Sequence, residues 1–448
     1  MLKDLRHYKI MCNLNSKIAI LHNRLNSSKA PNGRFYLFTF LLQIIPYIYG
    51  NTAKMKSHLF IGLTLLLAVS CKKENNQQRT APIPDQTEIN KLKINQLQIL
   101  GSHNSYHKHM DPRLYAFLQN INFILPKAYK VDELDYYHEP LSDQLDTYGL
   151  RGFEIDIYND PYGGLFYNRN GNRFAHMTVE SHISDLQKPG FKVLHLPDID
   201  YETHYYTFKA MLQALKDWSD KHPNHLPLFL LIETKEQTIG DVLGFLGFVK
   251  ALKFDAAAAD NIDVEIKSIF GNDLAKVITP DKVRGNYPTL EAAVLANNWP
   301  TVGDSRGKFI FVMEGTAEEI YAQGHPSFQN RAMFVVSNPG KPEAAFILED
   351  EPLKRQDTIQ QEVSLGYIAR TRADGPNNQN KTGDVSQMNA AFRSGAQIIS
   401  TDYYRPDPRY KTLPNIFKNY TCKFPNGELA RINPISAASK QSIGKIAE

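Results

Sequence analysis

The chain has 448 residues, of which 42% are hydrophobic, and its sequence pI is about 8.6. That length is ample for one large α/β barrel, which alone takes about 250 residues. Residues 1–70 contain nine basic residues and one acidic residue, so the rest of the chain has 42 basic and 46 acidic residues and a net charge of −4. This balance excludes the basic stripe that nucleic-acid-binding proteins show, and we expect no nucleic-acid partner.

A secretory leader is predicted near the N-terminus. From Met55 the sequence reads MKSHLFIGLTLLLAVSC, with a lysine, an apolar run from Leu59 to Val69 and a cysteine at position 71. This order is typical of a signal peptide, and Cys71 stands where bacterial lipoproteins carry their lipidated cysteine. The alternative is that Leu59–Val69 is an ordinary buried helix, because apolar runs of about 10–14 residues also occur in protein cores.

On the first interpretation, residues 1–54 are an over-extended start, residues 55–70 a lipoprotein signal peptide and residues 71–92 a polar tether. We then expect the protein in a bacterial cell envelope, lipid-anchored on a periplasmic or outer-membrane surface, as a monomer. The sequence has only three cysteines, Cys12, Cys71 and Cys422. Removing the leader leaves a single ordinary thiol, so neither a disulfide framework nor a cysteine-based metal site is expected.

Beyond the tether, short apolar runs rich in β-formers alternate with helical or loop-like stretches, as in a parallel α/β sheet. One of the helical stretches is Tyr205–His222, whose apolar residues recur at spacings of three and four. Eight runs predict a closed (β/α)8 TIM barrel over residues 93–420, with residues 421–448 as a C-terminal extension. The predicted strands are Leu97–Ser102, Gly152–Tyr158, Lys192–Pro197, Leu228–Glu233, Lys308–Glu314, Met333–Ser337, Gly366–Arg372 and Ile398–Tyr403.

Polar residues end the first four of these runs. Catalytic residues of such barrels gather at the C-terminal ends of the strands, so these side chains are candidates for one site. They are His103 and Asn104 in GSHNSYH, Glu154 and Asp156 in FEIDIY, His195 in VLHLP, and Glu233 and Lys235 in LFLLIETK.

The acidic residues of this set predict a site for a hard cation. Glu154 and Asp156 are two residues apart on one strand and therefore face the same way. A carboxylate pair on the inner face of a barrel is costly without a compensating cation. Three carboxylates and one amide oxygen suit Ca²⁺ or Mg²⁺ better than zinc, and ligands from three strands favour Ca²⁺, which accepts irregular geometry.

Two histidines at separate strand ends, beside such a metal, suit a phosphoryl displacement. One imidazole can take a proton from the attacking hydroxyl while the other gives a proton to the leaving oxygen. The alternative for any single histidine is a structural or surface role, which we assign to the remaining histidines near the site. An isolated carboxylate on a strand is likewise more often a solvated residue than a ligand.

The run from about Asn95 to Glu236 resembles the catalytic X-type region of phosphoinositide-specific phospholipase C. GSHNSY stands at its first His-Asn motif, LSDQLDTYGLRGFEIDIY at its Glu-x-Asp pair, VLHLPDID at its second histidine and LPLFLLIETK at its third acidic ligand. GYIARTRADG and IISTDYY resemble closing strands of the calcium-dependent bacterial and fungal branch. The resemblance implies His103 and His195 as the acid–base pair, Asn104, Glu154, Asp156 and Glu233 as Ca²⁺ ligands, and Lys235, Arg370, Arg372 and Asp402 as substrate-binding residues.

The implied activity is cleavage of a phosphatidylinositol-like lipid to diacylglycerol and an inositol phosphate, cyclic or linear. One departure bears on the substrate: relatives that bind polyphosphorylated headgroups carry a lysine pair after the fifth predicted strand, where this chain has Glu314. A carboxylate there would repel ring phosphates. Two alternatives stay open, a glycerophosphodiester phosphodiesterase, whose first strand normally ends in His-Arg-Gly, and a non-catalytic surface lipoprotein that binds headgroups.

Overall fold

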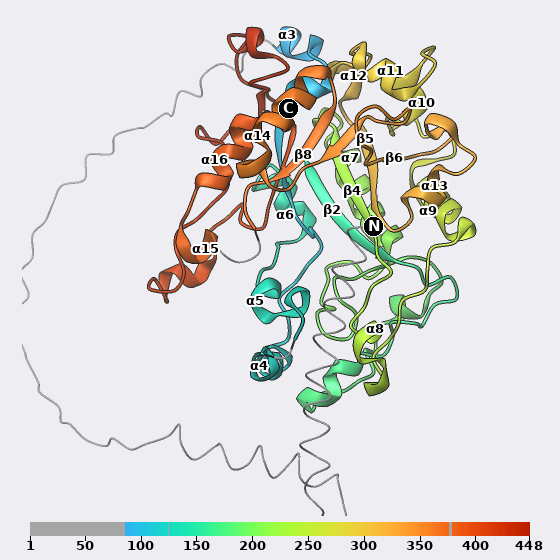
Figure 1. Ribbon diagram of the computed structural model, residues 1–448, viewed down its shortest axis with the longest axis vertical. Helices are drawn as coiled ribbons and strands as arrows, with labels where there is room; N and C mark the ends of the chain where they lie inside the picture. The colour runs from blue at the N-terminus through green and yellow to red at the C-terminus, as the bar shows by residue number, and fades with distance from the viewer. Residues whose placement is uncertain (1–85, 124, 376–378) are drawn as a thin grey trace, which may run out of the picture. The chain divides into compact units, whose positions relative to one another are not determined.

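The computed structural model describes residues 86–448, except residue 124 and residues 376–378 (Figure 1). Within these residues eight parallel strands form a barrel, in the order β6-β5-β4-β2-β1-β9-β8-β7. A bridge between Val336 and Phe346 joins the two ends of this order and closes the barrel. The strands are β1 (Leu97–Ser102), β2 (Gly152–Tyr158), β4 (Leu228–Thr234), β5 (Phe309–Gly315), β6 (Phe334–Val335), β7 (Phe346–Leu348), β8 (Ile368–Arg372) and β9 (Ile398–Thr401).

The predicted TIM barrel is confirmed, with one error in the choice of strands. Lys192–Pro197 is not a barrel strand, because only Lys192–Val193 forms a strand, β3, and it pairs antiparallel with the end of β2. On the side of β2 that faces β1, only Gly152 and Phe153 pair with β1, so the later residues of β2 are free to pair with β3. The missing barrel strand is β7, whose three residues are too short to show a sequence pattern.

The helices lie in the connections between strands. Before β1 is α3 (Gln86–Lys91), and the β1–β2 connection holds α4 (Pro112–Ile121), α5 (Val131–Leu134) and α6 (Leu141–Asp146). The β2–β4 connection holds α7 (Phe208–Lys221), and the β4–β5 connection holds α8 (Gly240–Leu243), α9 (Ala256–Phe270), α10 (Pro280–Arg284), α11 (Leu290–Leu295) and α12 (Val302–Ser305). The later connections hold α13 (Glu318–Ala322), α14 (Pro352–Leu365), α15 (Gln379–Thr382) and α16 (Ser386–Ser394).

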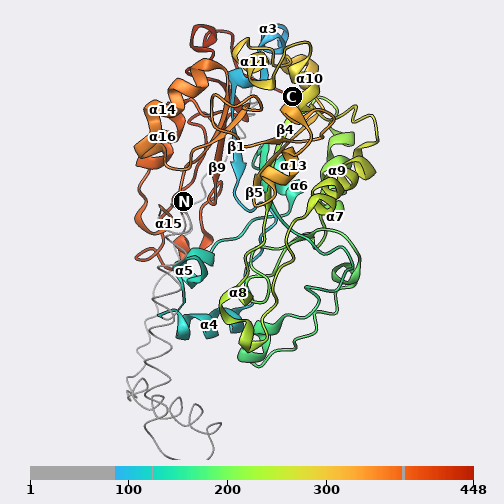
Figure 2. The ribbon, with the colours of Figure 1, turned by 45° about the vertical axis from the view of Figure 1, so that its right-hand side comes forward.

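Helix α7 shows how the sequence builds the outer layer. The Thr207 side chain accepts a hydrogen bond from the Ala210 backbone and caps the first turn. The apolar residues of its buried stripe, among them Met211 and Leu215, face the core, as the three- and four-residue spacing predicts. The helix lies beside α9, and α14 lies beside α16 on another side of the barrel (Figure 2).

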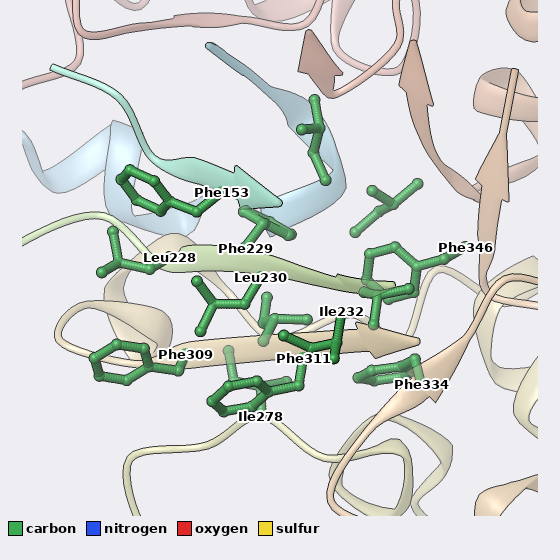
Figure 3. Packing of buried hydrophobic residues seen from close by; sticks show 14 of the residues in the cluster. Phe153, Leu228, Phe229, Leu230, Ile232, Ile278, Phe309, Phe311, Phe334 and Phe346 are labelled. Atoms are coloured by element: carbon green, nitrogen blue, oxygen red, sulfur yellow. The ribbon is translucent and has the colours of Figure 1, made fainter. Parts of the chain in front are cut away.

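The barrel interior is apolar up to the layer that carries the site. Phe229 and Phe346 meet edge to face inside the barrel, at 6.5 Å between ring centroids (Figure 3). Gly101 and Gly152 allow β1 and β2 to approach closely, because a Cβ at Gly101 would lie 2.8 Å from the Gly152 carbonyl oxygen. The packed apolar residues beneath the site therefore support the strand ends that carry its polar side chains.

Connections after β1, β2 and β4 extend beyond the C-terminal end of the barrel and form a second small apolar cluster. Its members include Leu114 and Leu118 of α4, Phe166 and Leu196 of the β2–β4 connection, and Phe248 after β4. In Figure 1, α4, α5 and α8 lie at this lower end, whereas α3, α10 and α12 lie at the opposite end. The second cluster therefore forms one wall around the ends of β1, β2 and β4.

The chain outside the predicted barrel boundaries contributes to the fold. Residues 86–91, within the stretch expected as a tether, form α3, whose Ile89 is buried in the main core. Within residues 421–448, β10 (Ala430–Ile432) pairs antiparallel with β1, and the side chain of Glu448 forms an ion pair with Arg151. The proposed leader and Cys71 lie outside the described residues. No helix among the described residues is long and apolar enough to cross a bilayer.

Candidate active site and metal centre

An acidic layer crosses the end of the barrel. Asp156 of β2 is in register with Glu233 of β4, which is in register with Glu314 of β5. Glu154 lies two residues before Asp156 on β2, so its side chain points to the same side of the strand. Glu154, Asp156 and Glu233 each offer one carboxylate oxygen within 4.8 Å of the others. The strand register therefore brings together the three carboxylates that the sequence singled out as metal ligands.

Cations already face this layer. The Lys235 ammonium lies 2.7 Å from Asp156 Oδ2 and 3.6 Å from Glu233 Oε2. Arg370 forms ion pairs with Glu154 and with Asp350. These contacts offset part of the negative charge, but they leave Asp156 Oδ1 buried without a hydrogen-bond partner among the described atoms.

A divalent cation fits this arrangement. Burial, followed by the carboxylates of Glu233 and Glu154, raises the pKa of Asp156 although Lys235 opposes the shift. Burial, together with repulsion from the negative charges of Glu154 and Glu233, raises the pKa of Glu314 to about 9. A bound cation would relieve both the repulsion and the unpartnered oxygen, and the all-oxygen donor set suits Ca²⁺ or Mg²⁺.

Asn104 lies beside the cluster. It has a left-handed backbone (φ 48°), and its neighbour Ser105 donates a backbone hydrogen bond of 2.9 Å to the Glu154 carbonyl. The Asn104 amide nitrogen donates to the Tyr136 hydroxyl at 2.6 Å. This bond fixes the amide nitrogen. Asn104 Oδ1, which accepts a 3.4 Å hydrogen bond from the Tyr106 hydroxyl, is then the atom that Asn104 can offer a cation. The uncommon backbone conformation is the kind often found at functional sites.

His103 is held between two carboxylates. Its Nδ1 lies 2.9 Å from Asp402 Oδ1, and its Nε2 lies 3.6 Å from Glu154 Oε1. Arg372 donates to Asp402 Oδ2 at 2.8 Å. Burial alone would raise the pKa of Asp402, but Arg372 and His103 hold it well below its usual range. Asp402 is therefore ionised and orients His103 so that its Nε2 faces the acidic layer.

His195 has its own carboxylate partner. Its Nδ1 lies 2.6 Å from Asp200 Oδ2, and its backbone carbonyl accepts a hydrogen bond of 3.0 Å from the Tyr158 hydroxyl. Burial lowers the pKa of His195 to about 4, against the opposing effect of Asp200. His195 is therefore neutral at pH 7 in the free protein.

One aromatic ring connects the two histidines. Tyr136 packs against His103 at 5.7 Å and against His195 at 6.2 Å between ring centroids. Since Asn104 also bonds the Tyr136 hydroxyl, this tyrosine contacts three of the predicted site residues. The structure therefore gathers His103, Asn104, His195 and the acidic layer at one end of the barrel.

The four residues expected to bind substrate are all engaged by other side chains of the site. Lys235 bonds Asp156, Arg370 bonds Glu154, and Arg372 and Asp402 bond each other beside His103. The sequence alone does not indicate a functional role for Asp200, Asp350, Tyr136 or His107. The one sequence signal for Asp200 is its place in LPDID, directly after His195, whereas Tyr136 and Asp350 lie in connections with no motif.

Known proteins resemble this chain over most of its length. The model of the family "Phosphoinositide phospholipase C, Ca2+-dependent" matches residues 92–434. Among solved structures, a Ca²⁺-dependent phosphatidylinositol-specific phospholipase C from Streptomyces antibioticus is 16% identical, covering 72% of this chain and 97% of its own, with a TM-score of 0.45. A calcium-dependent phosphoinositol-specific phospholipase C from Pseudomonas sp is 16% identical, covering 77% and 96%, with a TM-score of 0.42. No curated protein matches the chain.

Proposed function

Since the chain belongs to the Ca²⁺-dependent phosphoinositide phospholipase C family, we propose that it cleaves phosphatidylinositol-like lipids to diacylglycerol and a cyclic inositol phosphate. The general reaction class, a calcium-dependent phosphodiesterase of the phospholipase C type, follows from the family, whereas the substrate and products are the proposal. The observation that carries the finer proposal is the pair of carboxylate-bonded histidines, His103 and His195, beside three converging carboxylates.

Asn104, Glu154, Asp156 and Glu233 are the proposed calcium ligands. Glu154, Asp156 and Glu233 converge within 4.8 Å, and Asn104 adjoins them through the Ser105 contact to Glu154. When bound, calcium supplies Lewis acidity, which acidifies a hydroxyl group of the substrate and offsets the charge of its phosphate. Lys235 and Arg370 can keep these ligands in their orientation, because Lys235 contacts Asp156 and Glu233 and Arg370 contacts Glu154.

His103 is the proposed general base. Its Nδ1 faces the ionised Asp402, so Nδ1 carries the ring proton and Nε2 offers a lone pair toward the acidic layer. In the proposed reaction, the inositol hydroxyl next to the phosphoester attacks phosphorus, and its proton passes to His103 Nε2. A base next to the ligand cluster can reach a hydroxyl that the same cluster orients.

His195 is the proposed general acid. As the new bond to phosphorus forms, the bond from phosphorus to the glycerol oxygen breaks, and that oxygen receives a proton from His195. The ring is neutral in the free protein, since burial lowers the pKa of His195 to about 4. The negative charge of a phosphodiester bound beside it favours the protonated form, so we assign the loading of this proton to the substrate complex.

The headgroup we propose carries no phosphates beyond the diester. Glu314 stands in register with Glu233 at the end of β5, and together with Glu154 and Asp156 it makes this side of the site acidic. Extra ring phosphates would face these carboxylates rather than free cations, because Lys235, Arg370 and Arg372 are already paired. Phosphatidylinositol fits this charge pattern better than its bisphosphorylated derivative.

Phosphorus NMR of the products tests the proposal. With calcium present, phosphatidylinositol is expected to give the cyclic inositol phosphate signal first, and phosphatidylinositol 4,5-bisphosphate is expected to react at least about 10-fold more slowly. Glycerophosphoinositol serves as a water-soluble comparison. Release of glycerol 3-phosphate from it, with no cyclic ester at any time, would instead identify a glycerophosphodiester phosphodiesterase.

We also propose that the protein is anchored in the envelope by an acylated Cys71. The support is the apolar run from Leu59 to Val69 before this cysteine, both of which lie outside the described residues. Mass spectrometry of the protein from membranes is expected to find an N-terminal acylated Cys71 peptide. Recovery of an intact Met1 N-terminus from a soluble fraction would contradict the predicted processing.

A further inference from the structure

A second imidazole bonds the carboxylate that orients His195. His107 Nε2 lies 2.8 Å from both Oδ1 and Oδ2 of Asp200, and His195 Nδ1 lies 2.6 Å from Oδ2. The side chains of His107 and Asp200 are completely buried. We propose that His107 is a positioning residue: it holds the Asp200 carboxylate in the orientation that fixes the ring of His195 for proton transfer. This inference rests on the proposed role of His195 as the general acid.

Packing alone does not explain an imidazole at position 107. His107 Nδ1 is buried and has no hydrogen-bond partner among the described atoms. A buried polar atom without a partner is unfavourable, and a phenyl ring would fill the same space without one. The hydrogen bond between His107 Nε2 and Asp200 offsets the cost of burying Nδ1 without a partner.

The surroundings of His107 make it a rigid donor. Its backbone donates to Asn104 and accepts from His138, each at 2.9 Å. Its ring stacks on Tyr136, at 4.6 Å between centroids and 29° between planes, and meets the edge of His195 at 5.4 Å. A donor held on both its backbone and its ring can define the position of its acceptor.

Asp200 needs such a donor because only its backbone is fixed by the turn after His195. The Asp200 amide donates to the Leu196 carbonyl at 2.8 Å, and the Leu196 amide donates back at 3.0 Å. With His195 as its single donor, the carboxylate could rotate about its Cβ–Cγ bond. His107 also contacts Oδ1, the oxygen that His195 does not use, which removes that freedom. Burial would raise the pKa of Asp200, yet His107 and His195 hold it well below its usual range, so the carboxylate stays ionised.

Two substitutions separate positioning from packing. His107→Phe keeps the ring on Tyr136 but removes the donor, whereas His107→Gln keeps a nitrogen donor at the end of a side chain. On phosphatidylinositol we expect His107→Phe to lower kcat by about 10- to 100-fold with little change in KM, and His107→Gln to recover most of the activity. On a nitrophenyl ester of inositol phosphate, whose leaving group needs little protonation, His107→Phe should lose less than about threefold.

A double variant and a spectroscopic signal complete the test. If His107 acts through His195, adding His107→Phe to His195→Ala should cause no further loss on phosphatidylinositol. In proton NMR of the ligand-free protein, the Nδ1–H signal of His195, identified by its disappearance in His195→Ala, should shift in His107→Gln. This NMR measurement uses His107→Gln, so it still tests the proposal if His107→Phe does not fold. The control is His225→Phe, which removes another buried histidine, bonded to Ser219 ahead of β4.

His225→Phe is expected to show equal ratios of wild-type to variant activity on the two substrates. The proposal is overturned if His107→Phe loses the same factor on both substrates, if the double variant falls below His195→Ala by that factor, or if the His195 signal does not move. A wild-type protein that cleaves neither substrate would instead refute the proposed function, and the NMR signal would still report on the bond between His195 and Asp200.

Discussion

Removal of calcium is expected to abolish cleavage of phosphatidylinositol, with a loss of at least about 10²-fold, and zinc is not expected to restore activity. The reason lies in the donor set: Glu154, Asp156 and Glu233 offer only carboxylate oxygens within 4.8 Å of one another. Such hard ligands favour Ca²⁺, whereas zinc prefers sites that include imidazole or thiolate. Activity should be measured after chelation and dialysis, and then after adding back each metal separately.

A variant and a stability measurement connect this requirement to the predicted ligands. Calcium should raise the Tm of the wild-type protein, because a ligand that binds only the folded state stabilises it. Asp156→Asn should lose both this increase and at least about 10²-fold of the activity, since its buried Oδ1 has no partner among the described atoms. The matched control is Glu362→Gln on α14, which changes another poorly exposed carboxylate whose Oε2 has no partner there.

The control should keep both calcium effects. Full activity of metal-free protein in excess chelator would refute the calcium site altogether. Loss of activity in Asp156→Asn with an unchanged calcium shift in Tm would mean that calcium binds elsewhere and that Asp156 acts in another way.

Parts of this site could be read from sequence because they depend on strand periodicity. Glu154 and Asp156 had to share a face of β2, and the parallel register then placed Glu233 beside them. The barrel itself followed from recurring apolar runs. It was identified despite the wrong assignment of Lys192–Pro197, since the remaining seven runs overlap barrel strands.

Other parts depend on contacts that no local pattern encodes. His103 and Asp402 are 299 residues apart in the chain, and the parallel pairing of β1 with β9 brings them together. Asp402 bonds His103 in the structure, and its contact with substrate stays a prediction. Asp200 sits in a tight turn whose direction is set by backbone bonds with Leu196. Strand β7 was missed because Phe346–Leu348 is too short to show periodicity.

The two histidines are expected to differ in how their loss depends on the leaving group. His103 lies beside the ligand cluster, with Nε2 3.6 Å from Glu154 Oε1, and its proposed role is to accept the proton of the attacking hydroxyl. Every substrate needs that step. His103→Ala should therefore lose at least about 10²-fold on phosphatidylinositol and a similar factor on a nitrophenyl ester of inositol phosphate.

His195 is bonded to Asp200 on the β2–β4 connection, and its proposed role is to protonate the leaving glycerol oxygen. Nitrophenolate leaves without protonation, whereas an alkoxide does not. His195→Ala should therefore lose at least about 10²-fold on the lipid and much less on the nitrophenyl ester. The measurement is kcat for both variants on both substrates at saturating calcium. Equal losses in all four cases would refute the division of roles. Wild-type rates in both variants would refute the assignment of the active site, because a reaction that needs a base and an acid cannot keep its rate without both rings.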